Sequence, residues 1–209
     1  MGRYEKPRSR RFGRGAMIVL LALGLILLTW LIQCGLKPSR VELLTGAPLP
    51  DWVEEALIPV DGDSRRGVEL EDIRDIVIHY VGNPGTTAAQ NRSYYCSPQS
   101  EVSSHFLIGL EGEILLCVPL NEKSSASNNR NKDTISIEVC HPDDSGKFTD
   151  RSYASLVKLT AWLLENTGLN TDHIIRHYDI TGKECPRYFV QHEDAWKRFR
   201  ADVKERMAA

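Results

Sequence analysis

Two histidines, a lysine and a cysteine are the residues of this chain whose types and spacing could do chemistry. His177, Lys183 and Cys185 lie on one short stretch that leaves an apolar segment, and His79 ends a β-rich run far upstream. Imidazole and thiolate are the ligands that zinc prefers, and three protein ligands with an open fourth position are typical of a hydrolytic rather than a structural zinc. The lysine would add a fixed positive charge beside the metal. The four residues therefore predict a zinc hydrolase of amide bonds.

A single carboxylate inside an apolar strand pattern is a further candidate. Glu138 lies in residues 135–139 (ISIEV), where apolar side chains flank it at alternate positions. Burial of a carboxylate is costly unless the group is paired or points into a cleft. Partial burial and a nearby metal could tune its pKa for general-base work. A structural carboxylate that accepts a hydrogen bond from a loop amide is the alternative.

Together these residues resemble the motifs of the zinc-dependent N-acetylmuramoyl-L-alanine amidases, the family that includes phage-lysozyme-type amidases and peptidoglycan recognition proteins. The resemblance covers roughly residues 70–203, and its motifs are His79 after a strand, 103–108 (SSHFLI), 134–139 (TISIEV) and 177–186. It implies that His79, His177 and Cys185 hold Zn²⁺. The third ligand varies in the family between cysteine and aspartate, and members that lack a ligand bind peptidoglycan without cutting it.

The same resemblance implies a reaction and two catalytic roles. The family cleaves the amide between N-acetylmuramic acid and the L-alanine of the peptidoglycan stem peptide. Glu138 would activate the zinc-bound water, and Lys183 would stabilise the oxyanion; a surface lysine paired with Glu184 is the alternative reading of Lys183. A non-catalytic peptidoglycan-binding receptor of the same fold is the alternative function, and hydrolysis of another exported N-acyl substrate is a third. The intact ligand set favours the enzyme.

One position departs from the family pattern. Phage-type members carry a tyrosine directly before the histidine of the 103–108 motif, and this chain has Ser104 there, so we assign Ser104 no catalytic role. His105 is expected to support a ligand or to be structural rather than to bind the metal itself. The sequence contains no nucleophile elbow or cysteine-protease signature. Loop position alone suggests four residues that line a substrate groove: Asn83, Tyr94, Asn129 and Arg130.

The elements that must position these residues alternate between strands and helices. β-Branched and apolar runs predict strands at 74–80, 104–109, 113–118, 134–140 and 173–177. The second and third form a hairpin across Gly112. Helical periodicity predicts helices at 86–95, 150–168 and 192–207. The expected fold is α/β, with a mixed central β-sheet flanked by helices, like that of the amidases and peptidoglycan recognition proteins.

The N-terminal part of the chain has a different character. Residues 16–36 carry no charge and match the roughly 20 residues that cross a bilayer, so they predict a single transmembrane anchor. Basic side chains crowd residues 1–15, which the positive-inside rule places in the cytoplasm. We expect an extracytoplasmic linker or flap at 37–70 and the zinc amidase domain at 71–209. The predicted location is the cell membrane, single-pass, with the catalytic domain outside the cytoplasm.

Charge and cysteine content limit the partners. Residues 1–36 carry six basic and one acidic side chains, a net charge of +5, which leaves −7 for the rest because the 209-residue chain carries −2. An acidic domain lacks the clustered cations that nucleic acid requires, so peptidoglycan and the membrane are the expected partners of a monomer. Of the five cysteines, Cys96, Cys117 and Cys140 allow one disulfide, and buried thiols are favoured for Cys117 and Cys140.

Overall fold

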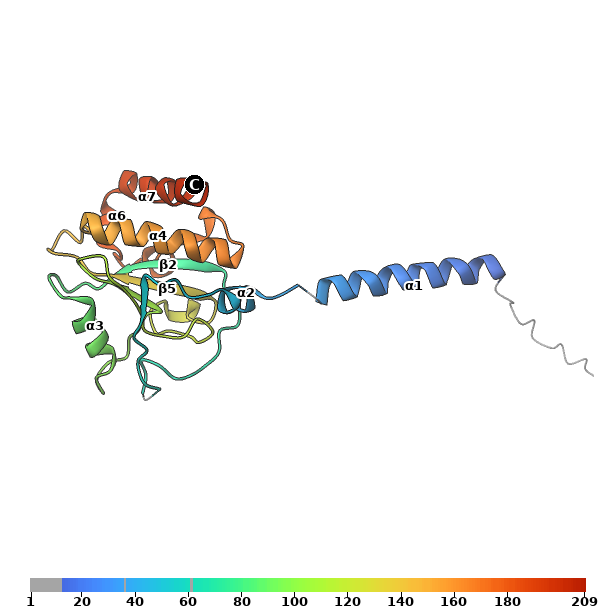
Figure 1. Ribbon diagram of the computed structural model, residues 1–209, viewed down its shortest axis with the longest axis horizontal. Helices are drawn as coiled ribbons and strands as arrows, with labels where there is room; N and C mark the ends of the chain where they lie inside the picture. The colour runs from blue at the N-terminus through green and yellow to red at the C-terminus, as the bar shows by residue number, and fades with distance from the viewer. Residues whose placement is uncertain (1–12, 36, 61) are drawn as a thin grey trace, which may run out of the picture. The chain divides into compact units, whose positions relative to one another are not determined.

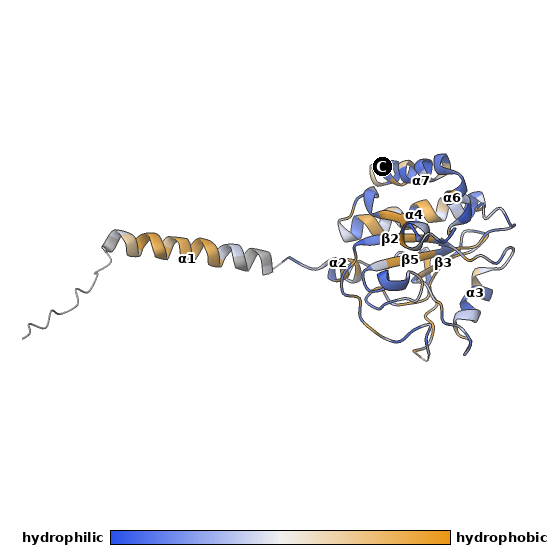
Figure 2. Ribbon diagram, turned by 180° about the vertical axis from the view of Figure 1, so that it is seen from behind, coloured by the Kyte–Doolittle hydropathy of each residue, from blue (hydrophilic) through white to orange (hydrophobic). Residues whose placement is uncertain are grey.

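The computed structural model describes residues 13–35, 37–60 and 62–209, and it divides the chain into two compact units, Met1–Pro38 and Ser39–Ala209. The first unit contains helix α1 (Arg14–Gly35), which is coloured as hydrophobic over most of its length in Figure 2. Most of the predicted cytoplasmic segment, and residue 36 of the predicted anchor, lie outside the described residues. None of the helices in the described ranges combines the length and apolar character that a membrane span requires.

The second unit is built on a six-stranded mixed sheet in the order β1-β4-β3-β5-β2-β6 (Figure 1). The strands are β1 (Val53–Glu55), β2 (Asp75–Tyr80), β3 (Phe106–Ile108), β4 (Ile114–Leu116), β5 (Thr134–Val139) and β6 (Ile174–Arg176). Strands β3 and β4 form the predicted antiparallel hairpin, and the other neighbours run parallel. The predicted mixed α/β fold is therefore confirmed.

Helices cover both faces of this sheet. They are α2 (Arg40–Gly46), α3 (Ala88–Tyr95), α4 (Asp150–Thr167), α5 (His177–Thr181), α6 (Arg187–Gln191) and α7 (Glu193–Met207), with short 3₁₀ turns at Asn128–Arg130 and Thr171–His173. Helices α4 and α7 lie on one side, and α3 lies on the other (Figure 1). The large core packs between the sheet and α4 with α7, and a smaller apolar cluster packs between the sheet and α3.

Helix α4 matches its sequence signals closely. The Thr149 side chain accepts a hydrogen bond from the Ser152 backbone N–H at the N-terminus, as a cap should. Gly168 ends the helix with φ 68°, the left-handed conformation that glycine adopts without strain. Leu156, Leu163 and other apolar residues on one face are buried in the large core. Because the large core covers only this face of the sheet, the other face carries both the smaller apolar cluster under α3 and polar side chains such as His79.

The segment predicted as a linker or flap belongs to the second compact unit. The unit begins at Ser39 rather than at residue 71, and it includes α2 and β1. Leu44, Val53 and Ile58 are buried because they fill gaps at the edge of the sheet and against α4. The predicted boundary placed these apolar residues outside the core, since prolines and glycines interrupt any long period there. We call residues 47–70 the strap.

Four cysteines in the described part of the chain are free thiols: Cys96, Cys117, Cys140 and Cys185. Cys117 and Cys140 are fully buried, and burial raises the pKa of both thiols to about 12. The expectation that these two are buried reduced thiols is therefore confirmed, and the described residues contain no disulfide.

Candidate metal centre and active site

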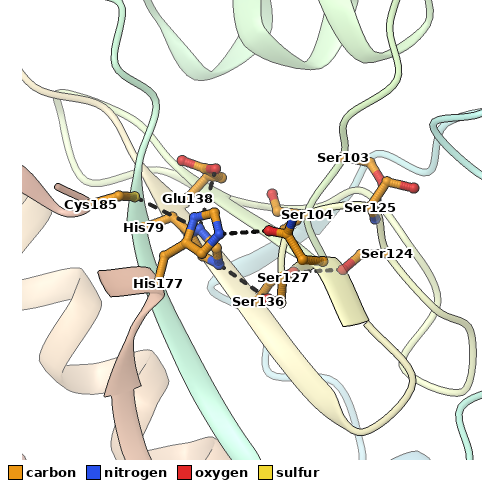
Figure 3. Close-up of polar contacts among 12 residues, drawn as sticks. His79, Ser103, Ser104, Ser124, Ser125, Ser127, Ser136, Glu138, His177 and Cys185 are labelled. Carbon is orange, nitrogen blue, oxygen red and sulfur yellow. Dashed lines mark hydrogen bonds and ion pairs between the residues drawn. The ribbon is translucent and has the colours of Figure 1, made fainter. Parts of the chain in front are cut away.

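His79, His177 and Cys185 meet at one end of the sheet (Figure 3). His79 is near the carboxyl end of β2, and His177 directly follows β6, the strand that pairs with β2 in parallel. Parallel neighbours bring their carboxyl ends to the same edge, so this pairing brings the two imidazoles together. One potential ligand atom from each of the three residues lies within 4.8 Å of the others. The structure thus assembles the predicted ligand set.

The individual contacts show which atoms face the centre of the cluster. His79 Nδ1 lies 3.8 Å from the Cys185 sulfur, and the two imidazole centroids are 4.7 Å apart. All three side chains are buried. Two nitrogens and one sulfur gathered in a buried pocket are the donor set that tetrahedral zinc takes in hydrolytic sites.

The thiol returns to the imidazoles because α5 is very short. The helix ends at Gly182, whose φ of 76° is left-handed and whose N–H donates to the Tyr178 carbonyl oxygen. The Tyr178 N–H in turn donates to the Cys185 carbonyl oxygen at 2.9 Å. This tight turn confirms the expectation that the segment between His177 and Cys185 folds back on itself. A side chain at residue 182 would strain that turn.

The electrostatics of the cluster suit a cation. Burial is the main cause that lowers the pKa of His79, and the charges of His177 and Lys183 lower it further. The pKa of His177 is also lowered, mainly by burial and to a lesser extent by the charge of Lys183. Both rings are therefore held neutral, the form that ligates a metal. Burial raises the pKa of the Cys185 thiol well above its usual range. A thiolate in this position requires a compensating positive charge, which a divalent metal supplies.

Glu138 lies beside the cluster on the next strand. It is the register partner of His79 across the parallel β2–β5 pair, and because side chains alternate between faces both point away from the large core. Its Oε1 is 3.8 Å from His79 Nδ1, and its buried Oε2 has no hydrogen-bond partner among the described residues. Burial raises the pKa of Glu138 to about 8, although Lys183 opposes the shift. This is a carboxylate placed to exchange a proton.

An open groove of about 1220 Å³ runs over the cluster. Glu138, His177, Lys183 and Cys185 all line it, whereas His79 lies buried beneath. The strap contributes one wall, together with residues of the loop after β4: Asp63, Arg66, Val68, Lys123, Ser124 and Ser125. The predicted alternative for Lys183 is not observed, since Glu184 pairs with Arg187 instead.

The four residues suggested as groove lining lie elsewhere. Asn83, Tyr94, Asn129 and Arg130 are absent from the groove walls. Arg130 instead pairs with Asp75 and Asp133, and so ties its loop to the start of β2 and β5. Beyond Lys123, Ser124 and Ser125, the residues of this loop that line the groove are Ala126, Asn128 and Asn131. Loop position predicted the correct loop but could not resolve which of its side chains turn inward.

Ser104 and His105 are structural, as expected. The buried Ser104 hydroxyl donates to the Phe106 carbonyl oxygen at 2.8 Å and lies 3.2 Å from the Tyr95 hydroxyl. His105 Nδ1 accepts from the Ser136 N–H, and its Nε2 lies 2.9 Å from the Glu122 carbonyl oxygen. Both ring nitrogens are therefore committed away from the metal cluster.

Comparison with known proteins identifies the family. Residues 69–188, more than half of the chain, match the family model described as N-acetylmuramoyl-L-alanine amidase. The chain belongs to the N-acetylmuramoyl-L-alanine amidase family. The match spans the whole cluster, from His79 to Cys185, and thereby confirms the resemblance inferred from the motifs.

Individual members of the amidase family are similar over the same region. The N-acetylmuramoyl-L-alanine amidase BlyA of Bacillus subtilis is 31% identical over 172 residues, which cover 72% of this chain and 46% of BlyA. The amidase CwlL of Bacillus licheniformis is 27% identical, with the same coverage. The solved catalytic domain of XlyA superposes with a TM-score of 0.64 at 27% identity, covering 72% of this chain and 98% of that domain. The chain thus matches less than half the length of these curated relatives, but nearly all of a catalytic domain.

Proposed function

We propose that this chain is a zinc-dependent N-acetylmuramoyl-L-alanine amidase that cleaves the amide between N-acetylmuramic acid and the L-alanine of the peptidoglycan stem peptide. The observation that carries the proposal is the convergence of His79, His177 and Cys185 in one buried cluster, with Glu138 beside it and an open groove over it. Membership of the amidase family supports the substrate. An intact ligand set supports hydrolysis rather than binding alone.

The cluster residues fit zinc in type and position. His79, His177 and Cys185 would hold the ion, and the open groove leaves room for a water molecule and a substrate carbonyl. When bound, zinc supplies Lewis acidity and lowers the pKa of a coordinated water towards neutrality. The raised thiol pKa of Cys185 fits this assignment, because only a cation makes a buried thiolate favourable at that position.

The chain's own residues move the protons and steady the charge. Glu138 accepts a proton from the attacking water and later delivers it to the departing L-alanine nitrogen. Burial raises the pKa of its carboxyl, and a bound cation would lower that pKa again towards the range in which a general base works. Lys183 projects from the same groove and carries a fixed positive charge. It stabilises the oxyanion that develops on the lactyl carbonyl oxygen of N-acetylmuramic acid.

The deciding experiment measures metal content and products of the purified full chain together. Stoichiometric zinc and release of free stem peptides from cell walls, both lost in Cys185→Ala, would support the amidase. Zinc without released peptides would indicate another N-acyl substrate. Muropeptide binding without zinc or products, unchanged in Cys185→Ser, would instead show a non-catalytic receptor.

We further propose that residues 16–36 anchor the catalytic unit to the cell membrane and that this unit works outside the cytoplasm. The support is the uncharged apolar sequence with basic residues on one side only, and the exposed apolar side chains of α1, which include Leu20, Leu23 and Ile26. Membrane fractionation with protease protection in spheroplasts tests this. Recovery of the intact chain in the soluble fraction would refute the anchor.

A further inference from the structure

Two residues adjacent in sequence, Ser127 and Asn128, contact the imidazoles of the cluster through their side chains, and Figure 3 shows Ser127 beside His79. The buried Ser127 hydroxyl oxygen lies 3.3 Å from His79 Nε2. The Asn128 side-chain oxygen lies 2.9 Å from His177 Nε2. Both residues belong to the loop between β4 and β5, so one loop reaches both histidines.

These contacts determine which nitrogen of each ring is free. A neutral imidazole has one N–H donor and one acceptor nitrogen. The Asn128 oxygen is a carbonyl oxygen and can only accept, so His177 Nε2 must carry the hydrogen and Nδ1 keeps its lone pair. His79 Nδ1 already faces Cys185 and Glu138, and the Ser127 hydroxyl can accept from the opposite N–H. Both rings thus keep Nδ1 as the nitrogen with a free lone pair.

The loop has its own fixed geometry. The Asn131 side-chain oxygen accepts hydrogen bonds from the backbone N–H groups of Ala126 and Ser127, at 3.1 and 2.6 Å. Asn128 has φ 54°, a left-handed conformation that asparagine tolerates better than most residues. Arg130 ties the loop to β2 through Asp75. The loop therefore does not depend on the histidines for its shape.

We propose that Ser127 and Asn128 are positioning residues that fix the Nδ1-ligating tautomer and the ring orientation of His79 and His177 for the metal. Partners of this kind orient ligating histidines, and their loss typically weakens metal binding about 10–100-fold. The inference rests on the proposed zinc at His79, His177 and Cys185. It does not depend on the substrate, so it is testable without any amidase assay.

The test compares zinc affinity among variants of the full chain by competition with a chromophoric chelator. Asn128→Gly removes the amide and keeps the left-handed backbone unstrained, and Ser127→Ala removes the hydroxyl; each should weaken zinc binding about 10–100-fold. Asn128→Asp keeps an acceptor oxygen and should remain within a few-fold of the natural chain. Asn129→Ala changes the neighbouring exposed asparagine, which does not line the groove, and serves as the matched control.

A second readout reports the tautomer directly. Imidazole ¹⁵N NMR of the chelator-treated chain should show His177 protonated at Nε2, and Asn128→Gly should give mixed tautomers. Thermal unfolding in chelator separates lost positioning from lost folding, and if Ser127→Ala does not fold, the Asn128 variants still decide. Unchanged zinc affinity in Asn128→Gly would overturn the inference alone. A natural chain that binds no zinc would overturn the proposed function itself, so the two failures are distinguishable.

Discussion

Replacing Glu138 with glutamine should abolish hydrolysis and yet stabilise the fold. Glutamine keeps the shape of the side chain but cannot accept a proton, so turnover should fall by about 10²–10⁴. Zinc content should not change, because Glu138 lies beside the ligand cluster rather than in it. The two effects have opposite signs because the carboxylate sits in a position that suits catalysis and not folding.

The size of the stabilisation follows from the pKa. Burial raises the pKa of Glu138 from 4.5 to about 8, and each pH unit corresponds to about 1.36 kcal/mol. That sets a ceiling of about 5 kcal/mol on the penalty for ionising the folded carboxyl. Its side chain is still 18% exposed, so we expect about 1–3 kcal/mol.

The sign can be checked through the pH dependence. Between pH 4.5 and about 8 the folded carboxyl keeps a proton that the unfolded one has lost. The protonated carboxyl therefore contributes stability that is fully present below pH 4.5 and lost as the pH rises through about 8. Glutamine does not titrate, so the advantage of the variant should be small near pH 5 and largest above pH 8.

Urea unfolding of both proteins in chelator, at about pH 5 and about pH 8.5, measures this difference, and peptide release with added zinc measures turnover. Glu184→Gln is the control. It also replaces a carboxylate with an amide, but Glu184 is exposed and pairs with Arg187, so neither the stability nor the turnover should change. Turnover above a tenth of the natural value, or an equal stability change at both pH values, would refute the reasoning.

Three further predictions concern the metal, the groove cation and the strap. Cys185→Ala should weaken zinc binding by more than about 100-fold, which exceeds the usual effect of losing a residue that only orients a ligand. Cys185→Asp should retain zinc, and equilibrium dialysis distinguishes the two variants. Lys183→Met should lower kcat by about 10²-fold with little change in KM. Lys132→Met, whose lysine pairs with Glu71 and does not line the groove, should not lower kcat, and equal losses in steady-state kinetics would argue against an oxyanion role. A chain that begins at Ser39 should fold, but one that begins at residue 70 should not. The shorter chain loses the buried side chains of Leu44, Val53 and Ile58, each worth about 1.5–3 kcal/mol, and their sum is comparable to the free energy of unfolding of a whole domain, about 5–15 kcal/mol. Thermal melting followed by circular dichroism tests both chains.

The residues of the His79, His177 and Cys185 cluster were predictable because their chemistry is local to the residue type. Histidine and cysteine have few roles at the end of an apolar run, and the eight-position step from His177 to Cys185 is bridged by a turn with its own glycine. Strands β2 and β5 and helix α4 were predictable for a similar reason. Their periodicity and caps are properties of neighbouring residues and need no knowledge of the rest of the chain.

The strap and the positioning loop could not be predicted in the same way. The apolar residues of the strap are spaced by prolines and glycines, and only the packed sheet shows that Val53 and Ile58 fill its edges. Asn128 and Asn129 are identical residue types in adjacent positions. A left-handed backbone at Asn128, stabilised by the Asn131 side chain, decides which of the two reaches His177.

The sequence by itself determined the reactive groups, the elements that carry them and the class of metal that they suit, since all of these depend on residue type and short-range spacing. The tertiary structure decided which of these groups meet. Parallel pairing of β2 with β5 and β6 brings Glu138 and His177 to His79, and these hydrogen bonds join segments distant in sequence. Burial follows from that assembly, and burial in turn raises the pKa of the Glu138 carboxyl to about 8 and that of the Cys185 thiol well above its usual range, so that the charged form of either group needs a compensating cation nearby.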